Sequence, residues 1–387
     1  MFSKRLLLFV GVPLFVISVV GSYFFFSSKN AGKAARKAKY QAAVSSGQLE
    51  VIDEGPKTAE CPLNGKMYTQ AQKEIWESRR PLGVAIENHL DARPQSGLSA
   101  ADVIYEAVAE GGITRFLAMY YCRDAKVIGP VRSARIYFVQ LLQGYGDKPL
   151  YGHVGGANTP GPANALGEIR DLGWENYNDM NQFGVPFPFY YRDYERLPNR
   201  VTEHTMYSST FKLWDYADKQ RELTNIDEKK VSWTKGFKPW KFKDDAGLAE
   251  RGTVNTIKFG FWEKFDAGNY NVTWKYNKEA NAYVRANGNT PHIDKNSSKA
   301  LVTKNVVVVF VDESPANDGY EGGHLLYDVV GQGDGVVFQN GKAAKIKWKK
   351  GSEKQQMVFT DSSGREVSLV RGQVFVEVLP TGNNVAY

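Results

Sequence analysis

Two arginines, Arg132 and Arg135, are the strongest candidates for chemistry in this sequence. They bracket Ser133 in the stretch VIGPVRSARIYF, which ends in an apolar run. Ser133 is a favourable N-cap, so the pattern predicts a helix over residues 134–143 that stops at Gly144. A helix start attracts anions through its free N–H groups and dipole, and guanidinium groups there disfavour the helix alone. We therefore expect a negative partner, either an internal carboxylate or an anionic ligand whose phosphate or carboxylate Arg binds bidentately.

Carboxylates for the internal alternative lie on a predicted β-hairpin. Gly111 and Gly112 form a two-residue turn signal between two strand-like runs, because glycine accepts the positive φ that such a turn requires. A regular register would place Glu106, Val108 and Glu110 on one sheet face with Arg115, diagonal to both glutamates. The hairpin thus predicts a salt-bridged cluster around Arg115.

Further polar side chains lie at the ends of predicted elements. Glu87 and His89 share one face of a strand by its two-residue period. Arg93 follows in a turn region, where side chains tend to face solvent or ligand. A single histidine at such a position is usually structural, but His89, His153 and His204 together favour a shared cleft. The predicted ligand-binding set is Glu87, His89, Arg93, Glu106, Arg132, Ser133, Arg135, His153 and His204.

No motif indicates a cofactor or a metal ion. The sequence has no Cys-x-x-Cys or His-rich spacing, no nucleophile elbow and no phosphate-binding P-loop. The glycine-rich GHVGGANTPG lacks the spacing of a dinucleotide fingerprint, and His292 and His324 resemble turn or surface residues. We expect no cofactor and no metal, and the sequence leaves open whether the protein is an enzyme.

The amino-terminal 27 residues predict a transmembrane signal anchor. Lys4 and Arg5 precede the uncharged run Leu6–Phe26, which is about long enough to cross a bilayer core. No small-x-small motif follows, which favours an anchor that is not cleaved. The Lys and Arg residues of segment 29–39 outnumber those before the run, and by the positive-inside rule this count favours a cytoplasmic body.

The residue patterns divide the rest of the chain into a stalk and two domains. Its content of 42% hydrophobic and 24% charged residues is that of a globular protein, and the net charge of +7 is modest, so we expect no nucleic-acid partner. Mixed helix and strand patterns give way to all-β patterns near residue 226. The predicted fold class is α+β, with a basic flexible stalk at 28–60, an α/β-type N-terminal domain at 61–225 and a β-rich C-terminal domain at 226–387.

The two cysteines, Cys61 and Cys122, have two readings. They could form one disulfide, which would imply an oxidising compartment, or they could be two unrelated buried thiols.

Long motifs carry a resemblance to a known family. RRPLGVAIENHLDARPQSGLSAADVIYEAVAEGGITRFLAMYY with IGPVRSAR, and later NVVVVFV and GQGDGVVFQNGKAAKIKW, resemble the YerB-type lipoprotein family of bacteria, from about Cys61 onward. The resemblance implies an N-terminal domain, a separate C-terminal β domain and a place in the cell envelope outside the membrane. It also favours the Cys61–Cys122 disulfide, and it transfers no catalytic residue. This chain has no cysteine near the end of its apolar run, so its anchor should be the helix itself.

We therefore expect a single-pass membrane protein, with most of the chain extracytoplasmic, that binds an anionic glycan or lipid phosphate. One alternative is a non-catalytic scaffold that binds another envelope protein through its aromatic β domain. Others are a phosphoryl or glycosyl transfer enzyme, with Glu87, Glu106, His89 and His153 as acid–base groups, and a body that faces the cytoplasm.

Overall fold

The computed structural model describes residues 55–262 and 270–387, together with Ser18 and Ser22. The rest of the predicted anchor, and the predicted stalk up to residue 54, lie outside the described residues. None of the described helices is both long and apolar enough to cross a bilayer.

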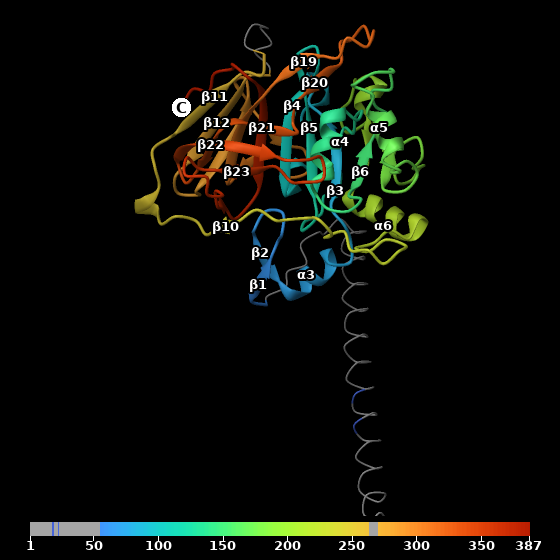
Figure 1. The fold of residues 1–387 in the computed structure, drawn as a ribbon, viewed down its shortest axis with the longest axis horizontal. Helices are drawn as coiled ribbons and strands as arrows, with labels where there is room; N and C mark the ends of the chain where they lie inside the picture. Colours follow the sequence, from blue (N-terminus) through green and yellow to red (C-terminus); the bar gives the residue numbers. More distant parts are fainter. Residues whose placement is uncertain (1–17, 19–21, 23–54, 263–269) are drawn as a thin grey trace, which may run out of the picture. The chain divides into compact units, whose positions relative to one another are not determined.

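A ten-stranded sheet runs through both halves of the sequence (Figure 1). Its central pairs join the halves: β25 lies parallel to β18 on one side and to β4 on the other, with Val374 opposite Val103. The near-continuous apolar runs of these strands suit a sheet that is covered on both faces. In spatial order the strands are β23 (Val358–Thr360), β22 (Lys342–Lys350), β21 (Gly331–Gln339), β18 (Asn305–Val311), β25 (Val374–Pro380), β4 (Val103–Glu110), β5 (Ile113–Tyr120), β3 (Leu82–Glu87), β6 (Leu150–His153) and β7 (Asp179–Asn181).

The first half holds the α-helices and the second half is mostly β, as the α+β class predicts. The helices and short elements of the first half are β1 (Lys57–Glu60), β2 (Met67–Thr69), α3 (Gln70–Trp76), η2 (Leu90–Ala92), η3 (Leu98–Ala100), α4 (Ile136–Gln143), α5 (Ala165–Asp171), β8 (Tyr191–Arg192), η4 (Thr202–His204), β9 (Met206–Tyr207) and α6 (Thr210–Arg221). The last residues of the predicted stalk are therefore structured, because β1 pairs antiparallel with β2.

A smaller sheet of the second half lies beside the large one (Figure 1). It packs there through Trp274, whose indole N–H donates to Glu377 of β25 at 2.9 Å. The strands of this smaller sheet are β11 (Thr256–Phe259), β12 (Val272–Asn277), β13 (Ala282–Asn287), β14 (Thr290–Pro291) and β17 (Val302–Thr303). The remaining short elements of the second half are β10 (Phe242–Lys243), η5 (Leu248–Glu250), β15 (Ile293–Asp294), β16 (Lys299–Ala300), β19 (Glu313–Pro315), β20 (Leu325–Tyr327) and β24 (Leu369–Val370).

Helix α4 starts later than the sequence predicts. It spans Ile136–Gln143 and stops at Gly144 as expected, but its N-cap is Arg135, and Ser133 makes no cap. The reason is a competing strand-like contact: the N–H of Ala134 donates to Gly155, and the N–H of Val154 donates to the carbonyl of Arg132. These bonds hold residues 132–134 extended, so the helix begins after them.

The β4–β5 hairpin turns at Gly111-Gly112 as predicted, but its register differs. Glu110 faces Ile113, whereas an irregularity between Val108 and Glu110 brings Ala107, not Val108, opposite Arg115. Because side chains alternate between faces, this shift of one residue moves Glu106 to the sheet face opposite Arg115. The predicted pairing of Arg115 with Glu106 is therefore wrong, and Arg115 pairs with Glu110 alone of these two.

A disulfide joins Cys61, just after β1, to Cys122, just after β5. Their Cα atoms are 6.0 Å apart, within the range that a disulfide spans. The carboxylate of Asp102 lies beside it and accepts the N–H of Cys122 at 2.9 Å. The predicted disulfide is confirmed.

Candidate functional site

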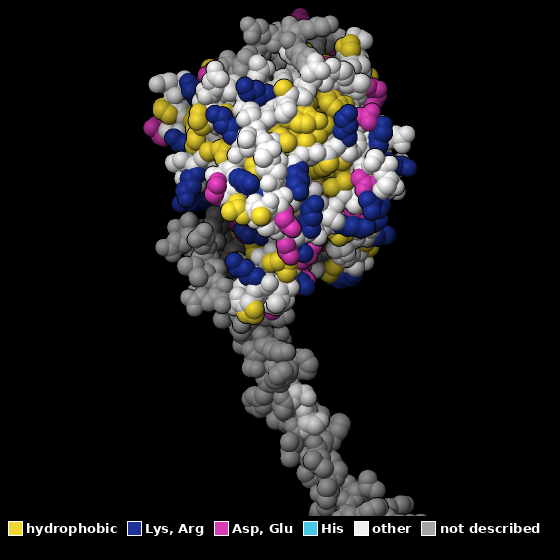
Figure 2. Space-filling model, turned by 90° about the vertical axis from the view of Figure 1, so that its left-hand side faces the viewer, with side chains coloured by type: hydrophobic (Ala, Val, Ile, Leu, Met, Phe, Trp, Pro, Cys, Tyr) yellow, Lys and Arg dark blue, Asp and Glu magenta, His cyan; other side chains and the backbone are white. Residues whose placement is uncertain are grey.

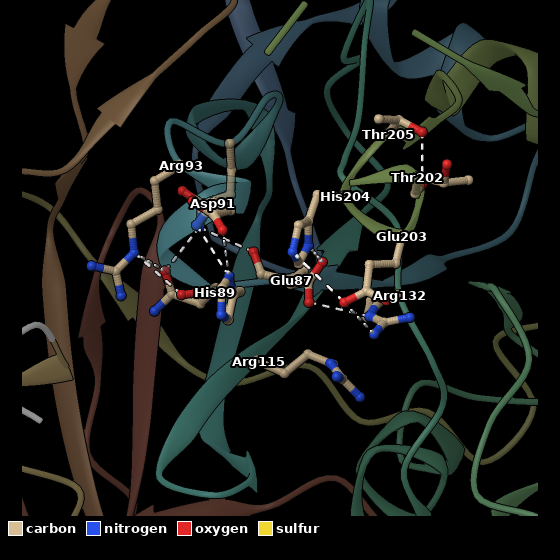
Figure 3. Close-up of polar contacts among 12 residues, drawn as sticks. Glu87, His89, Asp91, Arg93, Arg115, Arg132, Thr202, Glu203, His204 and Thr205 are labelled. Atoms are coloured by element: carbon tan, nitrogen blue, oxygen red, sulfur yellow. Dashed lines mark hydrogen bonds and ion pairs between the residues drawn. The ribbon is translucent and has the colours of Figure 1, made fainter. Parts of the chain in front are cut away.

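A polar cluster lies where β3 ends and the chain turns into η2 (Figure 3). Glu87 is the last residue of β3, and η4 brings a second set of side chains against it. The segment with Arg132 runs beside β3, since the Arg132 N–H donates to the carbonyl of Ala85 at 2.9 Å. We call this group the β3 cluster; its members are Glu87, His89, Asp91, Arg132, Arg200, Glu203 and His204.

Glu87 is the centre of the β3 cluster. One carboxylate oxygen accepts from Nε of Arg132 at 3.1 Å, and the other accepts from Nδ1 of His204 at 2.8 Å. Glu87 is only 4% exposed. Burial alone would raise its pKa, but the bond from His204 and the charge of Arg132 outweigh burial, and the pKa of Glu87 is lowered. The same bond raises the pKa of His204. The geometry thus favours a carboxylate beside an imidazole whose Nδ1 carries a proton.

The imidazole of His89 stacks on that of His204. The ring centroids are 4.7 Å apart and the planes differ by 8°. Nδ1 of His89 accepts the N–H of Asp91 at 3.1 Å, which caps η2. The Asp91 carboxylate is half exposed and lies 3.5 Å from Arg200, while Glu203 lies 3.8 Å from Arg132. The outer part of the cluster is therefore a layer of solvent-accessible ion pairs.

Arg135 pairs with an internal carboxylate, which is one of the two alternatives that the sequence left open. Its guanidinium is buried and donates to Glu110 at 2.5 Å, and Arg115 approaches the same carboxylate at 3.4 Å. Arg115 also donates to the carbonyl of Ser133 at 3.1 Å. The pKa of Glu110 is lowered, since the charges of Arg115 and Arg135 outweigh the burial that would raise it. Arg135 belongs to an internal network, whereas Arg132 belongs to the surface cluster.

Three other predicted site residues lie outside the β3 cluster. Arg93 donates to Asn88 at 2.9 Å and lies over the ring of Tyr270. Glu106 is buried beneath, where it accepts from Asn88 and Arg285. His153 is fully buried and bonds Asp179 of β7 at 2.6 Å.

Asn88 therefore connects the surface to the core, and the structure brings His89 and His204 together but leaves His153 apart from them. Ser133 contributes a carbonyl to Arg115 rather than a hydroxyl to a ligand.

Sequence reasoning missed the outer members of the cluster. Asp91 lies two residues after His89, and Arg200 and Glu203 lie just before His204, so proximity in sequence was the only signal. His292 was expected at a turn or surface but is 2% exposed, because it is bonded between Gln95 and Arg285. His324 is likewise buried, at 5% exposed.

The cluster also contains a set of side chains that could hold a metal ion. His89, Asp91 and His204 each present one ligand atom within 4.8 Å of the others. No spacing rule finds this set, because His204 reaches the other two only through the fold.

Comparisons with known proteins agree with the fold. Residues 68–224 match the family described as "Protein of unknown function (DUF3048) N-terminal domain", and residues 263–376 match its C-terminal domain. The chain is 29% identical over 342 residues to the Bacillus subtilis protein named "Putative lipoprotein YerB", covering 87% of this chain and 91% of that protein. The crystal structure of YerB from Bacillus subtilis matches with a TM-score of 0.66 at 26% identity, over 85% of this chain and 100% of that one. The resemblance predicted from the sequence is confirmed.

Proposed function

The chain belongs to the DUF3048 family of proteins of unknown function, and from this premise we propose that it is a membrane-associated cell-envelope protein that binds an anionic ligand at the β3 cluster.

Two observations support the location, and a third supports the kind of anchor. The Bacillus subtilis relative is named a lipoprotein. The disulfide suits an oxidising compartment outside the cytoplasm. Both cysteines of the chain are used in that disulfide, so we propose the apolar run Leu6–Phe26, rather than a lipid, as the anchor. The count of flanking Lys and Arg residues argues for the opposite orientation.

The observation that supports the anion site most strongly is how the guanidinium nitrogens of Arg132 are bonded. Its Nε is fixed by Glu87, but among the described residues its terminal nitrogens make no hydrogen bond and only a 3.8 Å ion pair with Glu203. The Arg132 side chain is 24% exposed and that of Glu203 is 55% exposed. An ion pair this open contributes little, so a phosphate or carboxylate can replace Glu203 at small cost. Arg132 is thus held in place while its donors stay available.

The face that Figure 2 shows carries no continuous basic surface. Its Lys and Arg side chains, on the left-hand side of Figure 1, are interleaved with Asp, Glu and hydrophobic side chains.

The scaffold alternative depended on exposed aromatic side chains in the second half. There Trp274, Tyr283 and Phe375 are fully buried. The most exposed phenylalanines that the structure describes, Phe183 and Phe187, lie in the first half. Tyr320 and Tyr387 are exposed in the second half, but since Trp274, Tyr283 and Phe375 belong to the core, we favour the anion site.

The test is binding of phosphate-bearing probes to the full chain in detergent. Soluble poly(glycerol phosphate) and phosphatidylglycerol in mixed micelles of the same detergent distinguish a glycan phosphate from a lipid phosphate. For the probe that binds, we expect Arg132→Ala to weaken binding at least tenfold, about 1.4 kcal/mol, and Arg132→Lys to restore it only in part. Arg170→Ala, which removes an arginine with a 64% exposed side chain on α5, is the control. Equal binding by the Arg132 and Arg170 variants would refute the site.

A further inference from the structure

We infer that the β3 cluster binds a divalent transition-metal ion through His89, Asp91 and His204, and that this ion holds the anionic ligand together with Arg132. The second part rests on the proposed function, and the first part does not.

His204 is already oriented as a metal ligand. Its Nδ1–H donates to Glu87 at 2.8 Å, which fixes the tautomer and leaves Nε2 as the lone pair of the neutral ring. Metal-binding histidines in proteins usually have such a carboxylate behind them. Glu87 is fixed in turn by Arg132, and Nε2 of His204 lies 3.8 Å from the Glu203 carboxylate, a contact that the metal ion would replace.

His89 and Asp91 supply the adjustable side of the site. Their ligand atoms and that of His204 lie within 4.8 Å of one another, whereas atoms bonded to one ion at about 2.1 Å lie roughly 3.5 Å apart. The stacked rings are nearly parallel, so their in-plane lone pairs do not yet converge on one point. The His89 side chain is 32% exposed and that of Asp91 is 49% exposed, and a turn of His89 breaks its bond from the Asp91 N–H and its stack on His204. The bond to the ion replaces that contact.

The charges of the cluster favour an ion. With both imidazoles neutral, the carboxylates of Glu87, Asp91 and Glu203 outnumber the guanidiniums of Arg132 and Arg200 within the cluster, although the charge of Arg115 also reaches Glu87. A divalent cation reverses this sign. When the cation binds the carboxylate of Asp91, it also releases Arg200 from its 3.5 Å ion pair with Asp91.

Two imidazoles and one carboxylate leave coordination positions open. An anion can fill an open position and contact the Arg132 guanidinium, and Arg200 becomes available to it as well. The binding of metal and anion should therefore be mutually reinforcing.

The first experiment titrates Zn²⁺ alone into the full chain, without a histidine tag and after removal of bound metal with a chelator. We expect one saturable site that is weakened at least about tenfold in His89→Ala and in Asp91→Asn. Both residues are partly exposed, so these variants should stay folded, which a thermal melt checks. Asp171→Asn and Arg170→Ala, which change side chains of α5 that are 75% and 64% exposed, are the controls. No saturable binding, or equal loss in the controls, overturns the metal site.

The second experiment measures poly(glycerol phosphate) binding with Zn²⁺ and with EDTA. We expect binding at least about tenfold tighter with Zn²⁺ in the parent chain and no such gain in His89→Ala. Arg132-dependent binding that is the same in Zn²⁺ and EDTA overturns the coupling and leaves the proposed function standing. Zn²⁺ binding without binding of either the polymer or phosphatidylglycerol does the reverse, because the metal site then stands and the anion site fails.

Discussion

At the residue scale, Arg132 and Arg135 have different roles, although they are only three positions apart in the sequence. Arg132 points to the open side of Glu87, where its terminal nitrogens remain available. Arg135 points into the fold and shares the carboxylate of Glu110 with Arg115. The extended backbone between them decides this outcome, since a helix from residue 134 would have directed both side chains differently.

Replacement of these two arginines should separate their roles by stability. Arg135→Ala leaves Glu110 with only the longer contact to Arg115, and we expect a loss of about 3 kcal/mol. Arg132→Ala leaves Glu87 bonded to His204, and we expect a loss of about 1 kcal/mol or less. Denaturant unfolding of both variants measures the difference. Equal large losses would mean that both arginines form one structural clamp and would count against the ligand site.

At the element scale, the site depends on how the ends of short segments are fixed to the sheet. Strand β3 ends at Glu87, and the turn η2 and the short helix η4 lie against that end. Elsewhere in the first half, the Cys61–Cys122 disulfide links the end of β1 to the segment after β5, and β1 itself makes only a short strand pair with β2.

The disulfide should be formed in cells and should stabilise the protein. It closes a loop with a sequence separation of 61 residues, and loop closure of this size contributes roughly 4 kcal/mol in the chain-entropy model. We expect the Cys61→Ser/Cys122→Ser variant to lose about 3 kcal/mol in denaturant unfolding.

The state of the two cysteines in cells also reports the location of the protein. Protein isolated from cells under alkylating, non-reducing conditions should show no free thiol. Two free thiols in that sample would argue for the cytoplasmic orientation that the Lys and Arg count suggested.

At the scale of the whole molecule, the two halves share one sheet and one buried polar centre. Arg285 of the smaller sheet donates to Glu106 of β4, and Glu377 of β25 lies beside them. Burial, together with the neighbouring Glu106, raises the pKa of Glu377 well above its usual range. Burial and the charge of Arg285 lower the pKa of His292. The centre thus keeps one charged pair, Arg285 with Glu106.

Removal of that pair should destabilise both halves together. Arg285→Met leaves the Glu106 carboxylate buried without its cation, and we expect a loss of at least about 3 kcal/mol with a single unfolding transition. Arg365→Met, at an arginine with an 81% exposed side chain, is the control and should change stability by about 0.5 kcal/mol or less. Two separate transitions in the parent chain would contradict the shared sheet as the unit of stability.

The sequence by itself determined the local features. The turn signal at Gly111-Gly112 predicts a hairpin, and the structure has it, because a positive φ at both turn positions is set by residue type. The change from mixed patterns to β patterns, and the family, could also be read from local motifs.

Tertiary structure decided the candidate site. An irregularity in β4 places Glu106 on the other face of the sheet, and backbone hydrogen bonds to residues 154–156 make α4 begin later than predicted. Neither effect can be recognised from the residue types alone. His204 reaches Glu87 and His89 from far along the chain. Pairing across such distances depends on how the elements pack, so the sequence could name the histidines but could not choose His204 over His153.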